Sequence, residues 1–264
     1  MRGSGAKFSV VIPCHNEEAM LPKTLGSVYA LRPEEVFFCL DRCTDETEKI
    51  VKRWSDAYAR RTVTTIRRYS EADGAGWRFR GGYLRRDAYT RARNDIIVNS
   101  SADLRLCPSI ARHVETIPDP YALISFHYYE NPWTIQCFER ALINKFMQGF
   151  AGLLAVSRAA WLDSEDIDDL KKIERGEDTH LKLSILKKYP THHFYTHSVH
   201  LRPNESKEDH YNRGLAIHAQ LRHTPLRVFI HSITLLRPGV FVGFMHARSR
   251  ASATRRGDNR DEKG

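Results

Sequence analysis

Short apolar runs alternate with helix-spaced segments through the first part of the chain. The runs are rich in Val, Ile and Phe and are too short for buried helices, which is typical of buried strands. They cover residues 8–13, 36–40, 63–66 and 96–98. Between them, apolar residues recur at helical spacing over 17–29, 44–58 and 87–93. Strands that alternate with helices predict an α/β fold with a mainly parallel sheet flanked by helices.

The second half of the chain is less regular. Its expected elements are a helix over 132–150, a strand leading into a helix over 152–161, a helix over 179–189 and a strand over 194–201. The apolar segment 226–246 is interrupted by Pro238-Gly239 and carries basic residues at its edges. The expected domains are a main domain over 1–210, C-terminal amphipathic helices over 211–246 and a disordered basic tail over 247–264.

Composition indicates a folded protein with a positive balance. The chain has 264 residues, of which 41% are hydrophobic and 28% charged, so wholesale disorder is excluded. Its 41 Lys and Arg against 32 Asp and Glu give a net charge of +9. This balance allows nucleic acid, anionic lipid or phosphorylated substrates as partners, and by itself does not choose among them.

Cysteine usage and hydropathy predict a cytoplasmic location. The five cysteines are scattered without a Cys-x-x-Cys pair, which argues against a disulfide framework or a structural zinc site. No signal-peptide apolar region precedes the first strand, and no run approaches the ~20 apolar residues of a spanning helix. We expect a cytoplasmic protein, either free or peripheral at the cytoplasmic membrane face.

Polar motifs follow three of the predicted strands. Pro13-Cys14-His15-Asn16-Glu17-Glu18 follows the first, Asp41-Arg42-Cys43-Thr44-Asp45-Glu46-Thr47 the second, and Ser101-Ala102-Asp103 the fourth. Ligands bind beyond the carboxyl ends of strands in such sheets, so we expect these side chains to share one site.

Together these motifs resemble family 2 glycosyltransferases, which have the Rossmann-like GT-A fold and transfer sugars with inversion. The family's strands end in P-x-x-N-E-E, D-D-G-S-x-D-x-T and D-x-D signatures. The resemblance covers residues 7–110 well and residues 150–200 more loosely. It implies a UDP- or GDP-sugar donor and a Mn²⁺ or Mg²⁺ cofactor.

The chain departs from the family pattern at two acids. Leu40 replaces the first Asp of the second motif, and Ser101 replaces the first Asp of D-x-D. The usual A-R-N-x-G segment is Arg85-Arg86-Asp87-Ala88 here. One fewer carboxylate weakens metal binding without abolishing it, because diphosphate oxygens and water supply most ligands of a hard cation.

The resemblance assigns donor-binding and metal-binding roles. The donor-binding residues are Pro13, Asn16, Glu17, Asp41, Asp45, Arg86 and Ala102, and the metal ligands are Asp103 and His200. Simpler roles compete with these assignments. Asn16 and Glu17 suit the start of a helix, and Arg85 and Arg86 suit a solvated helix surface. Asp103 suits a loop cap, and His200, one of 13 histidines, suits a purely structural role.

A catalytic pair is expected farther along the chain. Gly176-Glu177-Asp178 resembles the family's E-D motif, which makes Asp178 the catalytic base and gives Glu177 a role in orienting the acceptor or its loop. The alternative is that both acids simply stabilise the start of the 179–189 helix.

The C-terminal segment allows two interpretations. Its amphipathic pieces suit either the membrane interface or packing on the core, and the basic tail favours lipid. Gln220-Leu221-Arg222-His223 does not match the Q-x-x-R-W motif of processive members, so single-sugar transfer is favoured.

The predicted function is metal-dependent transfer of a sugar to a hydroxyl or phosphate of a lipid-linked or small-molecule acceptor. The alternatives are a catalytically weakened scaffold that binds nucleotide and a sugar nucleotidyltransferase. Nucleic acid is not an expected partner, because no basic stripe is interleaved with aromatic residues.

Overall fold

The structure is a computed structural model in two compact units. It describes residues 7–115, 123–130, 153–164, 166–173, 177–189, 191–202, 208, 211–212, 214–215, 224–234 and 238–261. The first unit consists of Met1–Asn131 and Met147–Arg202, and the second of Pro132–Phe146 and Pro203–Gly264.

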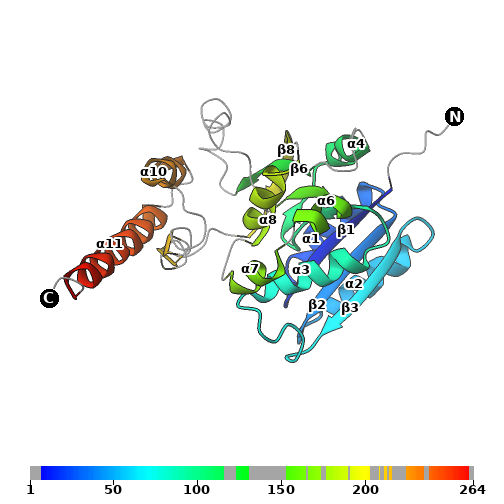
Figure 1. Cartoon of the computed structure of the whole chain (residues 1–264). Coiled ribbons are helices and arrows are strands. Elements are labelled where there is room, and N and C mark those ends of the chain that lie inside the picture. The colour runs from blue at the N-terminus through cyan, green and yellow to red at the C-terminus, as the bar shows by residue number, and fades with distance from the viewer. Residues whose placement is uncertain are drawn as a thin grey trace. The chain divides into compact units, whose positions relative to one another are not determined.

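The described part of the first unit is built on a mixed sheet with the strand order β3-β2-β1-β4-β7-β6-β8-β5 (Figure 1). The strands are β1 (Phe8–Cys14), β2 (Glu35–Asp41), β3 (Val63–Tyr69), β4 (Ile96–Asn99), β5 (Leu104–Arg105), β6 (Leu123–Glu130), β7 (Leu154–Ser157) and β8 (Thr191–His200). The pairs β1–β2, β2–β3, β1–β4 and β6–β8 are parallel. The strand β7 is antiparallel to β4 and β6, and β5 is antiparallel to β8.

Side chains alternate along each strand and so point to both faces of the sheet, and helices cover both faces. In β2, Val36, Phe38 and Leu40 enter one core cluster, whereas Phe37 and Cys39 enter the other. The first cluster is covered by α1 (Leu21–Ala30), α2 (Thr47–Tyr58) and α4 (Ser109–Glu115). The second is covered by α3 (Arg80–Arg91), α6 (Arg158–Ser164) and α8 (Glu177–Leu186), with α7 (Ile167–Lys172) before α8 (Figure 1).

This architecture confirms the predicted α/β fold, with differences in detail. The four N-terminal strands, the strand and helix over 152–161, the 179–189 helix and the 194–201 strand are present. The sequence did not predict β6, and α3 begins at Arg80 rather than at 87. The helix expected over 132–150 lies outside the described residues.

The amino-terminal edge of the strands is fixed by a buried carboxylate. Glu35 opens β2 and is 1% exposed. It accepts hydrogen bonds from Ser9 Oγ (2.7 Å), Thr65 Oγ1 (2.6 Å) and the Arg93 amide (2.8 Å). Because a buried carboxylate is tolerated only when its oxygens are satisfied, these bonds explain a glutamate inside the sheet.

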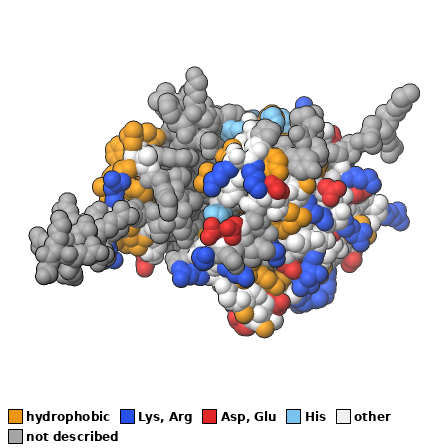
Figure 2. Space-filling model, viewed as in Figure 1, with side chains coloured by type: hydrophobic (Ala, Val, Ile, Leu, Met, Phe, Trp, Pro, Cys, Tyr) orange, Lys and Arg blue, Asp and Glu red, His pale blue; other side chains and the backbone are white. Residues whose placement is uncertain are grey.

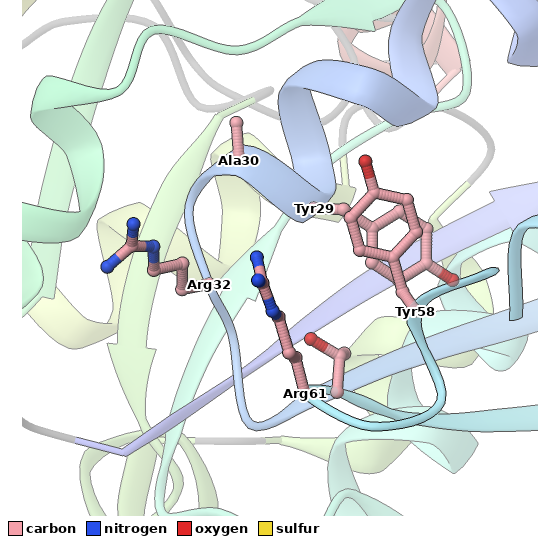
Figure 3. Close-up of a pocket in the computed structure, with 6 residues that line it drawn as sticks. Tyr29, Ala30, Arg32, Tyr58 and Arg61 are labelled. Atoms are coloured by element: carbon pink, nitrogen blue, oxygen red, sulfur yellow. The ribbon is translucent and has the colours of Figure 1, made fainter.

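A cavity of about 260 Å³ lies near this amino-terminal edge, where α1 and α2 end. It is lined by Tyr29, Ala30, Arg32, Tyr58, Arg61 and Thr62 (Figure 3). The rings of Tyr29 and Tyr58 stack with centroids 4.4 Å apart. In Figure 3, Arg61 extends toward the carboxyl end of α1, where the helix dipole stabilises a positive charge. The polar motifs follow the opposite ends of the strands, so this cavity is separate from them.

The second unit contains α10 (Pro225–Thr234) and α11 (Pro238–Asp261). Val228, Val240 and Phe244 form its buried cluster. Both helices begin in the region where amphipathic helices were expected, and α11 continues to Asp261, beyond the start of the expected disordered tail at 247. The reason is local: alanine and arginine, both good helix formers, recur after His246 without a proline. No helix in the described part of the chain is long and apolar enough to cross a membrane.

Candidate active site

The loops after β1 and β2 are joined by hydrogen bonds. Asn16 has a positive φ of 53°, and its Oδ1 accepts the Thr44 N–H at 2.8 Å. The Glu17 N–H donates to Thr47 Oγ1 at 2.7 Å, and the Thr47 N–H donates to Asp45 Oδ1 at 3.0 Å. Asp45 therefore accepts the N–H of the first residue of α2. Three predicted donor-site residues thus build a rigid frame at the carboxyl ends of β1 and β2.

Asp41 ends β2 and is held by two arginines. Its side chain is almost buried, and Oδ1 accepts hydrogen bonds from Arg80 Nε at 2.7 Å and from Arg42 Nε at 3.1 Å. Arg80 also donates to the carbonyls of Asp73 (2.6 Å) and Ser70. Asp41 therefore anchors Arg80, which ties the end of β2 to the segment after β3.

Asp103 lies in a cluster of charged side chains with His200, Arg202 and Glu17. Its Oδ2 contacts His200 Nε2 at 3.2 Å and Arg202 Nε at 2.8 Å, while its Oδ1 accepts the Ser101 hydroxyl at 2.6 Å. Arg202 also donates to both carboxylate oxygens of Glu17, at 2.5 and 2.7 Å. One arginine thus joins the loop after β1 to the predicted metal ligand.

The charges in this cluster set the protonation states of its acids. Burial raises the pKa of Asp103, but three neighbours lower it by more, so the pKa is well below its usual value. These neighbours are His200, through a hydrogen bond and its charge, the Ser101 hydroxyl, and the charge of Arg202. Burial raises the pKa of Glu17, which Arg202 opposes only in part. Asp103 is therefore ionised at neutral pH, as a metal ligand must be.

The register of two strands explains how His200 reaches Asp103. In the antiparallel pair of β5 and β8, Leu104 lies opposite His200. The residue before Leu104 is Asp103, and the Leu201 N–H donates to its carbonyl at 2.8 Å. The sequence positions are far apart, but this pairing places the histidine and the carboxylate side by side.

Asp103 and His200 fit a divalent cation as a partial ligand set. A carboxylate oxygen and an imidazole nitrogen are both common ligands of Mn²⁺. Within the described residues, no group of three or more His, Cys, Asp or Glu side chains could hold a metal. A cation here would need further ligands beyond these described side chains, and it would compete with Arg202 for Asp103.

Asp178 is the second residue of α8 and is partly exposed. The charge of Asp178 affects Tyr89 on α3. Burial raises the pKa of Tyr89, the positive charge of Arg85 lowers it, and the negative charge of Asp178 raises it further. Arg85 Nε donates to Asn99 Oδ1 at the end of β4, at 3.0 Å. Asp178 and Arg85 therefore both act on Tyr89, and Arg85 reaches the carboxyl edge of the sheet.

The other predicted residues differ in how closely they join this edge. Pro13 belongs to β1, and the buried Ala102 accepts the Thr24 hydroxyl at 2.7 Å on its carbonyl. Arg86 lies on α3 and is partly exposed. Glu177 is the first residue of α8, and its side chain lies outside the described residues.

The sequence motifs do not include Arg80 or Arg202, because neither arginine directly follows one of the motif-bearing strands. Arg202 could have been noticed two residues after the expected ligand His200, at the end of a predicted strand. Arg80 precedes the Arg85-Arg86 segment and has no motif of its own.

A family comparison accounts for this arrangement. The profile of glycosyl transferase family 2 matches residues 9–141, just over half of the chain. The chain belongs to glycosyl transferase family 2. This confirms the resemblance carried by the strand-end motifs, and this family 2 protein is a glycosyltransferase. No match was found among curated protein sequences.

Solved structures share the fold at low sequence identity. The mannosyltransferase PcManGT from Pyrobaculum calidifontis, in complex with GDP-Man and Mn²⁺, is 18% identical with a TM-score of 0.67, covering 95% of this chain and 76% of that chain. S. aureus TarS 1–349 is 18% identical with a TM-score of 0.57, covering 81% and 65%. Glucosyl-3-phosphoglycerate synthase from Mycobacterium tuberculosis, with Mn²⁺, UDP-glucose and phosphoglyceric acid, is 19% identical with a TM-score of 0.53, covering 83% and 80%. These likenesses establish the shared fold.

Proposed function

We propose that this glycosyltransferase moves a sugar from a UDP- or GDP-sugar, with inversion and with Mn²⁺ or Mg²⁺, to a hydroxyl or phosphate of a lipid-linked or small-molecule acceptor. The observation that carries the proposal is the cluster of Asp103, His200, Arg202 and Glu17. The GDP-Man, UDP-glucose and Mn²⁺ complexes of proteins with the same fold support it.

The donor is proposed to bind against the frame formed by the loops after β1 and β2. Pro13, Asn16, Glu17 and Asp45 shape this frame, and Ala102 contributes backbone from the other side. Asp41 acts through Arg80, whose guanidinium it orients (2.7 Å), so that a fixed positive charge lies beside the donor pocket. Arg86 and Arg85 add positive charge from α3 for the diphosphate.

Asp103 and His200 are proposed to hold the metal. When bound, the cation neutralises diphosphate charge and so stabilises the nucleoside diphosphate as a leaving group. Ser101 does not supply the first carboxylate of the D-x-D motif, but its hydroxyl donates a 2.6 Å hydrogen bond that orients Asp103. The buried position of Asp103 keeps water from screening its charge.

Asp178 is proposed to remove the proton of an acceptor hydroxyl as that oxygen attacks the anomeric carbon. The bond from the anomeric carbon to the diphosphate oxygen breaks at the same time, and its electron pair leaves with the nucleoside diphosphate. Attack from the face opposite the leaving group gives inversion. Glu177, at the start of α8, is proposed to orient the acceptor.

A nucleotide-binding scaffold without turnover is the second candidate. Two observations favour it: Leu40 is buried in the core instead of supplying a carboxylate, and Arg202 contacts the only acid left in the D-x-D position. In a scaffold the nucleotide binds but no sugar leaves it.

A donor screen tests the proposed function. We expect UDP or GDP with Mn²⁺ to raise the melting temperature by about 5 °C or more at saturating concentration, because a ligand at 100 times its Kd stabilises by about 2.7 kcal/mol. The stabilising nucleotide should then identify a sugar nucleotide that the protein hydrolyses slowly without acceptor. A shift without turnover on any donor would favour the scaffold, and no shift with any nucleotide would reject both.

Arg202→Gln tests whether this arginine competes with the metal. Removing a charge-assisted hydrogen bond to Asp103 Oδ2 frees one ligand oxygen, so we expect Mn²⁺ affinity without nucleotide to rise about tenfold. The measurement is a titration of free Mn²⁺ by electron paramagnetic resonance. Arg105→Gln, an exposed arginine on the neighbouring strand β5, is the matched control. Unchanged or weaker Mn²⁺ binding in Arg202→Gln alone would contradict the competition.

A further inference from the structure

The second unit concentrates exposed apolar side chains on α10 and α11. Seven large hydrophobic residues are exposed among the described residues, and five of them belong to these two helices. The five, here called the α10–α11 apolar face, are Leu226 (67% exposed), Phe229 (44%), Ile233 (55%), Val242 (56%) and Met245 (40%). Scattered single exposures are ordinary, whereas exposed apolar residues that gather on one pair of helices suggest a surface for interaction.

This face is distinct from the inner packing of the two helices. On α10 its residues follow the spacing of 226, 229 and 233, which forms one helical stripe. Val228, Val240 and Phe244 are buried between the helices instead. Figure 2 shows hydrophobic side chains gathered over α10, with basic side chains beside them. The helices therefore have apolar residues on both an inner and an outer side.

Tight backbone packing supports the α11 part of this surface. A Cβ atom at Gly243 would lie 2.1 Å from the Tyr211 carbonyl oxygen, so only glycine permits this approach. Phe229 and Phe241 contact edge to face with centroids 5.1 Å apart. The Phe229–Phe241 contact joins α10 to α11, and the Gly243 contact joins α11 to Tyr211. The five side chains of the face, Phe229 included, are nonetheless at least 40% exposed.

The sequence of the two helices carries only positive charge as far as Gly257. Residues 224–257 contain six arginines and no aspartate or glutamate. Two of these, Arg248 and Arg250, are exposed on α11 directly after the apolar residues. A nucleic-acid backbone would use the arginines but not the apolar stripe. A bilayer with anionic headgroups uses both, because apolar side chains enter the acyl boundary while arginines meet lipid phosphates.

We propose that the α10–α11 apolar face binds the surface of an anionic membrane, with α10 lying in the interface. The helices do not need to span the bilayer for this, in keeping with the absence of a spanning helix in the described segments. This inference rests on the proposed function only for the biological role of membrane binding, which would keep the enzyme at a surface where lipid-linked acceptors are found. Its physical basis is independent of sugar transfer.

Vesicle sedimentation of the full chain tests the proposal. The probes are vesicles of phosphatidylcholine alone and of equal parts phosphatidylcholine and phosphatidylglycerol. We expect the partition coefficient to be at least about tenfold higher for the anionic vesicles, because each arginine near such a surface contributes about 1 kcal/mol. It should fall again in high salt.

Two variants and one control assign the binding to the face. Leu226→Ser with Ile233→Ser removes two of its most exposed side chains and should lower partitioning about tenfold or more. Arg248→Gln with Arg250→Gln should remove much of the preference for anionic vesicles. Leu162→Ser, on α6 of the first unit and 49% exposed, should change nothing.

Several outcomes would overturn the proposal. One is no binding to either vesicle; another is equal binding by the Leu226→Ser/Ile233→Ser variant and the wild type. Salt-sensitive binding to duplex DNA without vesicle binding would assign the arginines to nucleic acid. A dimer that the double variant converts to monomer, without vesicle binding, would make the face a subunit interface. The nucleotide-dependent thermal shift should persist in the double variant, so failure here is separable from failure of the proposed function.

Discussion

Asp178→Asn is expected to lower kcat for sugar transfer by about 10³-fold while the Kd for the nucleotide donor stays within about twofold. An amide has nearly the shape of the carboxylate but cannot accept the acceptor's proton. Donor affinity is unaffected because the proposed donor frame lies on the loops after β1 and β2, not on α8. Single-turnover assays with a radiolabelled sugar donor, together with calorimetric donor titration, measure both quantities.

The competing explanation for Asp178 is helix stabilisation, and it makes a different prediction. An acid in the first turn of α8 interacts favourably with the helix dipole, so a purely structural role would cost about 0.3–1 kcal/mol of stability and leave kcat unchanged. Asp169→Asn on α7 is the matched control, since Asp169 is exposed and pairs with Lys172. Normal turnover by Asp178→Asn would remove it from the chemistry.

Asp103→Asn is expected to abolish the Mn²⁺-dependent part of donor binding and to reduce kcat/KM by about 10³-fold or more. Metal charge stabilisation is worth several kcal/mol, and the amide loses the charge that holds the cation. The variant also leaves Arg202 and the Ser101 hydroxyl without their ionised acceptor, so some stability is lost as well. Mn²⁺ titration with and without nucleotide separates the metal effect from the stability effect.

Ser101→Ala is the control for Asp103→Asn. It removes only the 2.6 Å hydrogen bond to Asp103 Oδ1 and keeps the charge, so it should reduce metal affinity by no more than about tenfold. If Asp103→Asn binds Mn²⁺ as tightly as Ser101→Ala does, the metal lies elsewhere. Unlike Asp178→Asn, Asp103→Asn should lose donor affinity, so the two variants distinguish the two proposed roles.

Local pattern was sufficient to predict the half of the sheet that carries the motifs. The strands β1 and β2 are continuous apolar runs bounded by polar residues, and burial on both faces requires such runs. The start of α3 was missed because Arg80-Gly81-Gly82 contains two poor helix formers and no apolar periodicity. The pairing of β6 with β8 joins distant segments, and no local signal specifies such a contact.

The candidate site was predictable where a residue's role follows from its own strand and not where it depends on a distant partner. Asn16, Asp41 and Asp103 were found because each follows a strand that the sequence defines. The arginines that pair with Asp41 and Asp103 were not, because Arg80 comes from a helix start and Arg202 lies two residues beyond the end of β8. Which of two adjacent arginines reaches the sheet edge depends on the rotation of α3, and the structure gives that contact to Arg85.

The arginine shared by Glu17 and Asp103 has a thermodynamic consequence. A cation that binds Asp103 Oδ2 competes with the Arg202 contact at 2.8 Å, and an anion that attracts Arg202 reduces that competition. Each ligand therefore favours the other by the same factor, as reciprocity of coupled equilibria requires. A nucleoside diphosphate and a divalent ion would then bind as a cooperative pair, and either alone would bind weakly. The proposed metal site would therefore stay largely empty until the donor binds.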